Sequence, residues 1–202
     1  SKISIFPLSS SPIRTMSVEI LNKLIQLLKK DFLIEIFLDE RSEISKLLLD
    51  NIKYKNIIIR DPKDKSELFL MVKTIQYGLF MDSGPLHIAK MFKKRGLLLE
   101  TSVSSDILLK NYNLIKGVKN NFSSNYCKAP CGLTDIFNLN NKFGCYDSLK
   151  IKKTTLINQK FKNMTNRGVK NNYFGNFKNS VGCISSLNIQ NIYFAILKDL
   201  SL

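Results

Sequence analysis

Tyr77-Gly78-Leu79-Phe80-Met81-Asp82-Ser83-Gly84-Pro85-Leu86-His87-Ile88-Ala89-Lys90 is the stretch that decides the fold. The apolar run 79–81 is typical of a buried strand, and the four residues 82–85 combine turn residues with residues that begin helices. Apolar positions then follow at a spacing that favours a helix. The stretch therefore predicts a strand, a tight turn and a helix, and it contains the only histidine of the chain.

The predicted start of the helix is a place where an anion can bind. The first N–H groups of a helix have no partner and the helix dipole adds positive charge, so a phosphate is stabilised there. Gly84 allows a close approach of the backbone, and Pro85 suits a first helical turn. His87 can reach a phosphate or sugar oxygen, and Asp82 can accept hydrogen bonds from hydroxyls. The alternative is an ordinary connection, with Asp82 or Ser83 as the N-cap and His87 half exposed.

Outward from this stretch, strands and helices alternate along residues 1–101. This order favours a parallel sheet with helices on both faces, an α/β fold. A sixth strand is predicted at 113–116. The predicted strands are 3–7, 32–38, 57–59, 79–81 and 97–99, and the predicted helices are 17–30, one through 47–49, one around 68–72 and one from 86.

The loops that follow these strands are polar. In a parallel sheet such loops meet beyond the carboxyl ends of the strands, where ligands bind. The first of them has three serines, Ser9, Ser10 and Ser11, and Arg14, which together predict an oxyanion site. The converging loops are 9–15, 39–41, 61–65, 82–87 and 101–105.

Composition predicts a globular protein with an anionic partner. The chain has 202 residues, of which 44% are hydrophobic, and this content excludes general disorder. The net charge is +15, with +5 in residues 1–100 and +10 in residues 101–202. A phosphorylated ligand, a lipid surface or a nucleic acid would fit this charge. With no leader and no run of membrane-spanning length, we expect neither secretion nor a transmembrane anchor, and the start in mid-strand suggests a fragment.

The second half of the chain has four cysteines and a basic segment. Cys127, Cys131, Cys145 and Cys183 are separated by three, thirteen and thirty-seven residues, which matches no standard zinc finger. Reduced thiols and a zinc site both stay open, and disulfides are not expected. Residues 150–180, rich in Asn and Lys, suggest a long basic or partly disordered loop. Residues 186–200 predict an amphipathic helix that packs on the domain, with membrane contact as the lesser alternative.

With these residues quoted, the sequence resembles the heptosyltransferase-like glycosyltransferases, carbohydrate-enzyme family nine. The family signature is Asp-(Ser/Thr)-Gly-x-x-His after a strand, and residues 82–87 keep every defined position. The resemblance covers about residues 1–115 and implies one half of a GT-B fold, a Rossmann-like parallel sheet that binds the donor. From the residues and the resemblance together, we divide the chain into a Rossmann-like nucleotide-sugar-binding core at 1–118, a cysteine-containing basic loop region at 119–185 and a closing helix at 186–202 that packs on the domain.

The resemblance also implies roles for single residues. Ser9, Ser10 and Arg14 would contact the donor diphosphate, Glu40 the ribose, and Asp82, Ser83, Gly84 and His87 the phosphate and sugar end. Arg14 stands where the family often has lysine, and its fork geometry differs. Residues 100–104 read Glu-Thr-Ser-Val-Ser where the family usually has Gly-Pro-Thr after the fifth strand. The catalytic base is expected in an N-terminal domain that this chain lacks, so no catalytic residue is assigned.

The resulting hypothesis is the donor-binding half of an inverting bacterial glycosyltransferase. The donor would be a nucleotide-diphospho-sugar, the sugar a heptose or similar, and the acceptor a lipopolysaccharide or surface glycan. We expect no cofactor, no metal and no nucleic acid, and a cytoplasmic location with peripheral contact to the anionic inner face of the membrane. The alternative is a noncatalytic basic module that binds nucleic acid or an anionic lipid surface through the Lys-rich second half.

Overall fold

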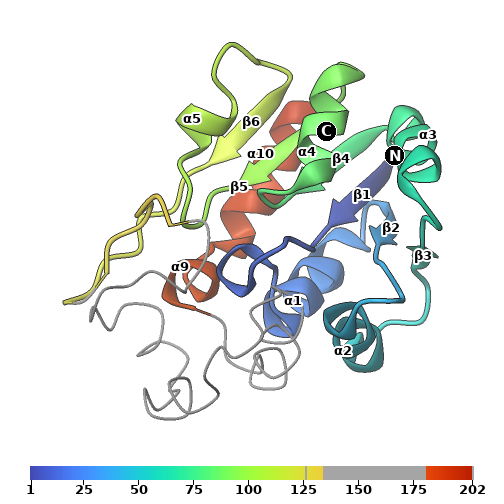
Figure 1. Cartoon of the computed structure of the whole chain (residues 1–202), viewed down its shortest axis with the longest axis horizontal. Helices are drawn as coiled ribbons and strands as arrows, with labels where there is room; N and C mark the ends of the chain where they lie inside the picture. The colour runs from blue at the N-terminus through green and yellow to red at the C-terminus, as the bar shows by residue number, and fades with distance from the viewer. Residues whose placement is uncertain (126, 134–180, 202) are drawn as a thin grey trace, which may run out of the picture.

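The chain folds around one six-stranded sheet in which every strand pairing is parallel (Figure 1). The structure is a computed structural model that describes residues 1–125, 127–133 and 181–201. The strand order is β3-β2-β1-β4-β5-β6. The strands are β1 (Lys2–Phe6), β2 (Leu33–Phe37), β3 (Ile58–Arg60), β4 (Tyr77–Phe80), β5 (Arg95–Leu99) and β6 (Ile115–Val118).

Helices cover both faces of this sheet, as the alternating sequence predicts. The described helices are η1 (Pro12–Arg14), α1 (Val18–Leu28), α2 (Glu43–Asn51), α3 (Lys65–Thr74), α4 (Gly84–Met91), α5 (Ser105–Leu108), α9 (Gly182–Ser185) and α10 (Ile189–Leu200). Their starts follow local chemistry. Ser17 caps α1 by accepting from the N–H of Ile20, and Asp64 caps α3 by accepting from the N–H of Glu67.

The strands send alternate side chains into two cores. Ile3 and Ile5 of β1 lie in the core under α1, α2 and α10, whereas Phe6 lies in the core under α3, α4 and α5. Phe6 stacks between Phe37 and Phe80, with ring centroids 4.3 and 5.0 Å away. These rings fill the space at the ends of three neighbouring strands, so the second core reaches the carboxyl edge of the sheet, the edge formed by the C-terminal ends of the strands.

Charged side chains hold the opposite edge, the amino edge, together. Asp199 near the end of α10 is buried, accepts a hydrogen bond from the Tyr77 hydroxyl at 2.9 Å, and pairs with Lys116 and Arg95. These partners belong to β4, β6 and β5, so one carboxylate fixes the closing helix to three strands. Burial and the hydrogen bond to Asp199 raise the pKa of Tyr77.

A second buried carboxylate joins three strands. Glu35 in β2 accepts from Ser4 Oγ at 2.5 Å and lies 3.1 Å from both Lys2 Nζ and Arg60 Nε. Burial alone would raise the pKa of Glu35, but the hydrogen bonds from Ser4, Lys2 and Arg60 outweigh it and hold the pKa below its ordinary value. The carboxylate is therefore ionised and paired at neutral pH.

The fold class predicted from the sequence is confirmed. Each predicted strand and helix through residue 101 is present, while β6 begins at Ile115 rather than at 113, and the short helices η1, α5 and α9 were not predicted. The predicted C-terminal helix is present as α10, which packs on α1. The basic stretch 150–180 lies outside the described residues. No helix within those residues combines the length and apolar character needed to cross a membrane.

Candidate functional site

The strand order reverses between β1 and β4, and this is where open parallel sheets bind ligands. From β1 the chain moves outward to β2 and β3, then returns to place β4 on the other side of β1. Phe6 and Phe80 are paired at the ends of these two strands. The polar segments 9–15 and 82–87 both begin within three residues of this pair, so they meet at the carboxyl edge.

The loop after β1 is held in shape by its own hydroxyls and by buried anchors. Thr15 Oγ1 accepts from the N–H of Ser9 at 3.1 Å and donates to the carbonyl of Ser11 at 2.9 Å. Ile13 and Met16 are fully buried below the loop. The sequence thus builds a closed turn that presents Ser9, Ser10 and Arg14 at the edge of the sheet.

Arg14 and Asp82 form an ion pair at the switch point, where the carboxyl ends of the neighbouring strands β1 and β4 meet. Arg14 Nη1 lies 2.8 Å from Asp82 Oδ2, and Arg14 Nη2 donates to Ser10 Oγ at 2.9 Å. Ser9 Oγ donates to the backbone carbonyl of Asp82 at 2.9 Å. Asp82 therefore holds the Arg14 guanidinium in place. The structure therefore brings together Ser9, Ser10, Arg14 and Asp82.

Helix α4 begins directly after this cluster. Ser83 is its N-cap residue but makes no side-chain cap bond, and its Oγ donates instead to the Met81 carbonyl at 3.3 Å. Gly84 is the first helical residue, and a Cβ built there would meet nothing within 4 Å. Its φ lies outside the left-handed region that favours glycine. The fold itself does not require glycine at this position.

Glu40 and His87 do not join the cluster. Glu40 is exposed after β2, and its backbone N–H donates to Asp61 Oδ1 at 3.2 Å. His87 lies in the first turn of α4 but is exposed, and it has no hydrogen-bond or ion-pair partner among the described residues. The sequence predicts His87 in the first turn of a helix, and it lies there, but its side chain is at the surface.

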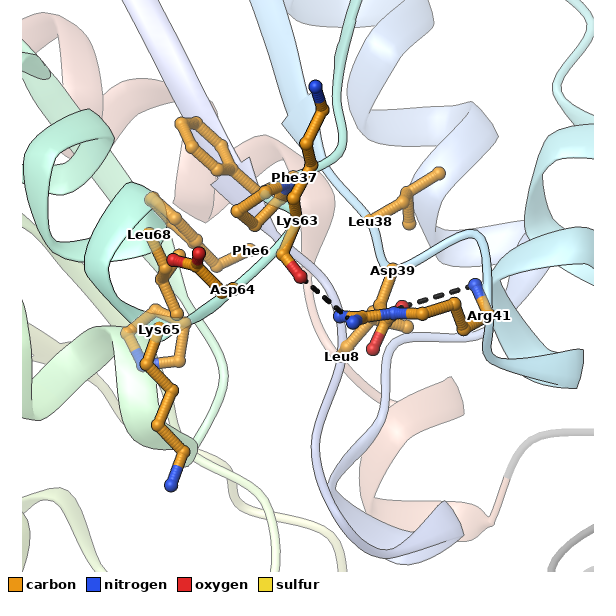
Figure 2. A pocket seen from close by; sticks show the side chains of 12 residues that line it. Phe6, Leu8, Phe37, Leu38, Asp39, Arg41, Lys63, Asp64, Lys65 and Leu68 are labelled. Carbon is orange, nitrogen blue, oxygen red and sulfur yellow. Dashed lines mark hydrogen bonds and ion pairs between the residues drawn. The ribbon is translucent and has the colours of Figure 1, made fainter.

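A pocket of about 510 Å³ opens beside the cluster, at the carboxyl ends of β1 and β2 and the start of α3. Figure 2 shows Phe6 and Leu68 on one side of it and Asp39 with Arg41 on the other. Pro85 connects the pocket to the first turn of α4. The lining residues are Phe6, Leu8, Phe37, Leu38, Asp39, Arg41, Pro62, Lys63, Asp64, Lys65, Leu68 and Pro85.

Two loops fix the polar side of this pocket. Arg41 Nε donates to Asp39 Oδ1 at 2.8 Å, and Arg41 Nη1 donates to the carbonyl of Lys63 at 2.9 Å (Figure 2). The bond from Arg41 holds the pKa of Asp39 below its ordinary value, so this carboxylate is ionised at neutral pH. Residues 39–41 and 61–65 were predicted to converge, but the pocket uses Asp39 and Arg41 where the sequence pointed to Glu40.

The segment after β5 is built around a buried carboxylate. Glu100 accepts from the N–H and the Oγ of Ser105 at 2.7 and 2.8 Å and from the N–H of Asn120 at 3.1 Å. Next to it, the hydroxyls of Thr101 and Ser102 are buried without a hydrogen-bond partner in the described part of the chain. Glu100 therefore has a structural role that the sequence did not reveal, and two unpartnered hydroxyls follow it.

The described residues contain no group of three or more His, Cys, Asp or Glu side chains that would hold a metal ion. Cys127 and Cys131 are free thiols, Cys183 is buried, and Cys145 lies outside the described residues. Burial, together with the neighbouring Cys131 thiol, raises the pKa of Cys127. The zinc hypothesis for the four cysteines stays a prediction, because one of its ligands is not described.

Comparisons with known proteins give two solved structures and no sequence match. No protein-family model and no curated protein matches the sequence. The chain is similar to ADP-heptose LPS heptosyltransferase II of E. coli at 13% identity and a TM-score of 0.46, over 58% of this chain and 38% of that one. It is also similar to E. coli heptosyltransferase WaaC with ADP at 8% identity and a TM-score of 0.48, over 65% and 38% of the two chains. The matches thus span well under half of either enzyme.

Proposed function

We propose that this chain binds a nucleotide-diphospho-sugar at its carboxyl edge and is the donor-binding half of a glycosyltransferase. One observation carries the proposal. The switch point between β1 and β4 holds a fixed cation, Arg14, and the hydroxyls of Ser9 and Ser10. These groups lie beside the start of α4 and an apolar pocket. This juxtaposition combines the groups that a diphosphate and a nucleoside need, within one edge of one sheet.

The diphosphate would lie between Arg14 and the start of α4. A guanidinium and the unpaired N–H groups of a helix both stabilise phosphate oxygens. Asp82 orients Arg14, and the contact between Arg14 and Ser10 is at the exposed side of the cluster, where a phosphate oxygen can take the place of the Ser10 hydroxyl. We assign Ser9, Ser10, Arg14, Ser83 and Gly84 to the diphosphate.

The nucleoside would occupy the pocket of about 510 Å³, whose size suits a small organic ligand. Its floor of Phe6, Phe37 and Leu68 offers apolar surface to a base, and Asp39 at the rim offers an ionised carboxylate to ribose hydroxyls. Glu40 is the neighbouring carboxylate that the family resemblance assigns to the ribose, but it is exposed and does not line the pocket.

The sugar would lie beside Asp82 and His87. Asp82 Oδ2 is occupied by Arg14, while Oδ1 has no partner among the described residues and can accept from a sugar hydroxyl. His87, on the exposed side of α4, would contact the donor from the open side. We further propose a heptose or a similar sugar, a lipopolysaccharide or surface-glycan acceptor, and inversion at the anomeric carbon.

The catalytic base would belong to an N-terminal domain outside this chain, so the chain alone binds the donor and transfers nothing. Positive charge for the leaving diphosphate comes in this proposal from Arg14 and the start of α4, and no metal is required. The location would be the cytoplasmic side of the membrane, where peripheral contact brings the chain to a glycolipid acceptor.

The test is a calorimetric titration of the folded chain with a panel of nucleoside diphosphates and the matching nucleosides. We expect one diphosphate to bind more tightly than its nucleoside, because the diphosphate adds the contacts at Arg14 and α4. A chain that shows a cooperative melting transition but binds no diphosphate contradicts the proposal. Sugar transfer by this chain alone contradicts the assignment of the base to another domain.

The alternative basic module has a different signature. Its Lys-rich segment lies mostly within residues 134–180, outside the described residues. Nucleic-acid affinity through such a segment falls steeply with salt because counterions are released, and it does not depend on Arg14 or Asp82. Binding that follows salt but ignores both residues would favour that alternative over donor binding.

A further inference from the structure

The segment that follows β6 contains two of the cysteines, and it turns back on itself (Figure 1). Ser123 and Lys128 pair there as an isolated antiparallel bridge. The N–H of Ser124 donates to the carbonyl of Cys127 at 2.8 Å, and the N–H of Cys127 donates to Ser124 Oγ at 3.1 Å. These bonds hold the backbone of Cys127 in the turn.

The backbone on either side of Cys131 is also held. The N–H of Ala129 donates to the carbonyl of Phe122 at 2.9 Å, and the N–H of Gly132 donates to the carbonyl of Ser102 at 2.7 Å. Ala129 is buried, and Phe122 packs against the core that contains α1. Cys131 therefore lies between two anchored residues.

The side chains of Cys127 and Cys131 meet, and a hydrogen bond joins the two thiols. Four residues of extended chain span about 13 Å, whereas a disulfide needs Cα atoms within about 7 Å of each other, so the contact depends on the reversal of the chain. Cys127 is half-buried, while Cys131 is exposed. We call these two residues the thiol pair.

We propose that the thiol pair is a reversible modification site, at which a small disulfide such as glutathione disulfide oxidises Cys127 and Cys131 to an intramolecular disulfide. The two sulfur atoms already meet, and the exposed Cys131 is open to both oxidant and reductant. A transient disulfide of this kind also occurs in proteins that have no structural disulfides.

A metal ion fits the thiol pair less well than a disulfide does. A structural zinc site takes four ligands, and the thiol pair supplies two. Within the described ranges no three His, Cys, Asp or Glu side chains gather to complete such a site. Neither thiol lines the pocket or belongs to the Arg14 cluster, so the proposal is independent of donor binding.

The reaction consists of two thiol–disulfide exchange steps. The Cys131 sulfur attacks as the thiolate, breaks the S–S bond of glutathione disulfide and releases one glutathione thiolate, which takes up the proton that Cys131 lost. The Cys127 sulfur then loses its proton, attacks the Cys131 sulfur and releases the second glutathione. Two protein thiols and one glutathione disulfide thus give one protein disulfide and two glutathione thiols.

The experiment incubates the whole chain with glutathione disulfide and follows each cysteine by alkylation and mass spectrometry. We expect peptide mapping to link Cys127 to Cys131, with the loss of two hydrogen atoms, and dithiothreitol to reverse the change. The glutathione adduct should not accumulate, because Cys127 lies next to Cys131 and displaces the glutathione.

Single variants separate the two steps. Cys127→Ser should keep one glutathione on Cys131, since no neighbouring thiol remains to displace it. Cys131→Ser should react at Cys127 at least about tenfold more slowly than Cys131 reacts in the parent chain, because Cys127 is half-buried. The matched control Cys145→Ser should form the same disulfide within about twofold of the parent rate. Circular dichroism checks that each variant is folded.

Three results would overturn the proposal. The first is a glutathione adduct on Cys131 of the parent chain that persists without a disulfide to Cys127. The second is a main product that links either thiol to Cys145 or Cys183. The third is stoichiometric zinc in the purified parent chain that is lost in Cys127→Ser and in Cys131→Ser, which would assign the thiol pair to a metal site.

Discussion

The two edges of the sheet use the same kinds of residue for opposite purposes. At the amino edge, the carboxylate of Asp199 is buried, and Tyr77, Lys116 and Arg95 are its partners. At the carboxyl edge, Arg14 and Asp82 form one pair beside an open pocket, and the hydroxyls of Thr101 and Ser102 have no partner in the described residues. The two ion pairs thus differ in their surroundings, and the open pocket beside Arg14 and Asp82 is the reason that we propose a ligand at the carboxyl edge.

The largest expected effect is on stability at the amino edge. Asp199→Ala leaves the buried Tyr77 hydroxyl without its acceptor and frees the end of α10 from β5 and β6. We expect the free energy of unfolding to fall by about 3 kcal/mol, because a buried polar group loses its partner within a charged network. Urea denaturation of the two chains measures it.

The control for this change is Lys116→Ala at the same network. Lys116 is largely exposed, and Tyr77 and Arg95 still contact the Asp199 carboxylate when Lys116 is removed, so the free energy of unfolding should fall by only about 1 kcal/mol. Neither variant should alter binding of a nucleoside diphosphate. A loss of binding in Asp199→Ala at a temperature where it is folded would show that the two edges are not separate.

The next effect is on binding at the carboxyl edge. Arg14→Ala should weaken binding of a nucleoside diphosphate about tenfold or more, because charge-assisted hydrogen bonds contribute about 1.5–3 kcal/mol. Binding of the nucleoside alone should change little. Calorimetry with both ligands measures the difference, and equal losses for the two would remove Arg14 from the diphosphate.

Arg14→Ala also leaves the Asp82 carboxylate without its partner, so two further variants separate binding from stability. Arg14→Lys keeps the charge and should retain most of the diphosphate affinity with less of the fork geometry. Arg41→Ala changes the pocket rim instead and should weaken nucleoside and diphosphate alike. A loss of diphosphate binding alone in Arg41→Ala, with equal losses for nucleoside and diphosphate in the Arg14 variants, would exchange the roles assigned to the two arginines.

A smaller effect concerns the start of α4. Gly84→Val should reduce diphosphate binding more than His87→Ala, because a branched side chain blocks the approach to the helix N–H groups. His87→Ala removes one side-chain contact and should cost about 1 kcal/mol. Since a Cβ at Gly84 meets no protein atom within 4 Å, melting temperatures should stay similar. Normal binding by a folded Gly84→Val chain would place the ligand elsewhere.

The smallest effect is a pH dependence from Glu35. Its pKa is lower in the folded chain than the ordinary value of 4.5, so the unfolded chain binds the proton first as the pH falls. Its contribution to stability is complete above that value and is lost as the pH decreases through the folded pKa. Glu35→Gln should flatten this decline between about pH 5 and pH 3, measured by denaturant unfolding. An unchanged slope would mean that other carboxylates dominate acid unfolding.

The sequence predicted the elements well because their signals are local. Strand runs such as 79–81 and the helix start at Ser17 depend on neighbouring residues, and the structure confirms both. The polar loops after the strands were also predictable, since a parallel sheet must bring them to one edge. Ser9, Ser10, Arg14 and Asp82, which the sequence predicts at one edge of the sheet, lie together in the structure.

The rest of the site depends on contacts between distant segments. The pairing of Arg14 with Asp82 joins residues 68 positions apart, and the bond from Arg41 to the carbonyl of Lys63 joins residues 22 apart, so neither leaves a local pattern. Phe6 and Phe37 line the pocket, but as apolar strand ends they look the same as core residues. Glu40 and His87 occupy the expected positions, yet their side chains are exposed, because a motif fixes order along the chain and not the direction of a side chain.

The most direct measurement of the difference between the two edges is hydrogen exchange of the chain with and without the best-binding nucleoside diphosphate. We expect slower exchange of amides in residues 9–15, 39–41, 62–65 and 82–87, which surround the pocket and the Arg14 cluster. Amides beside Tyr77, Arg95 and Lys116 at the amino edge should be unchanged. Protection at the amino edge with none at the carboxyl edge would contradict the account.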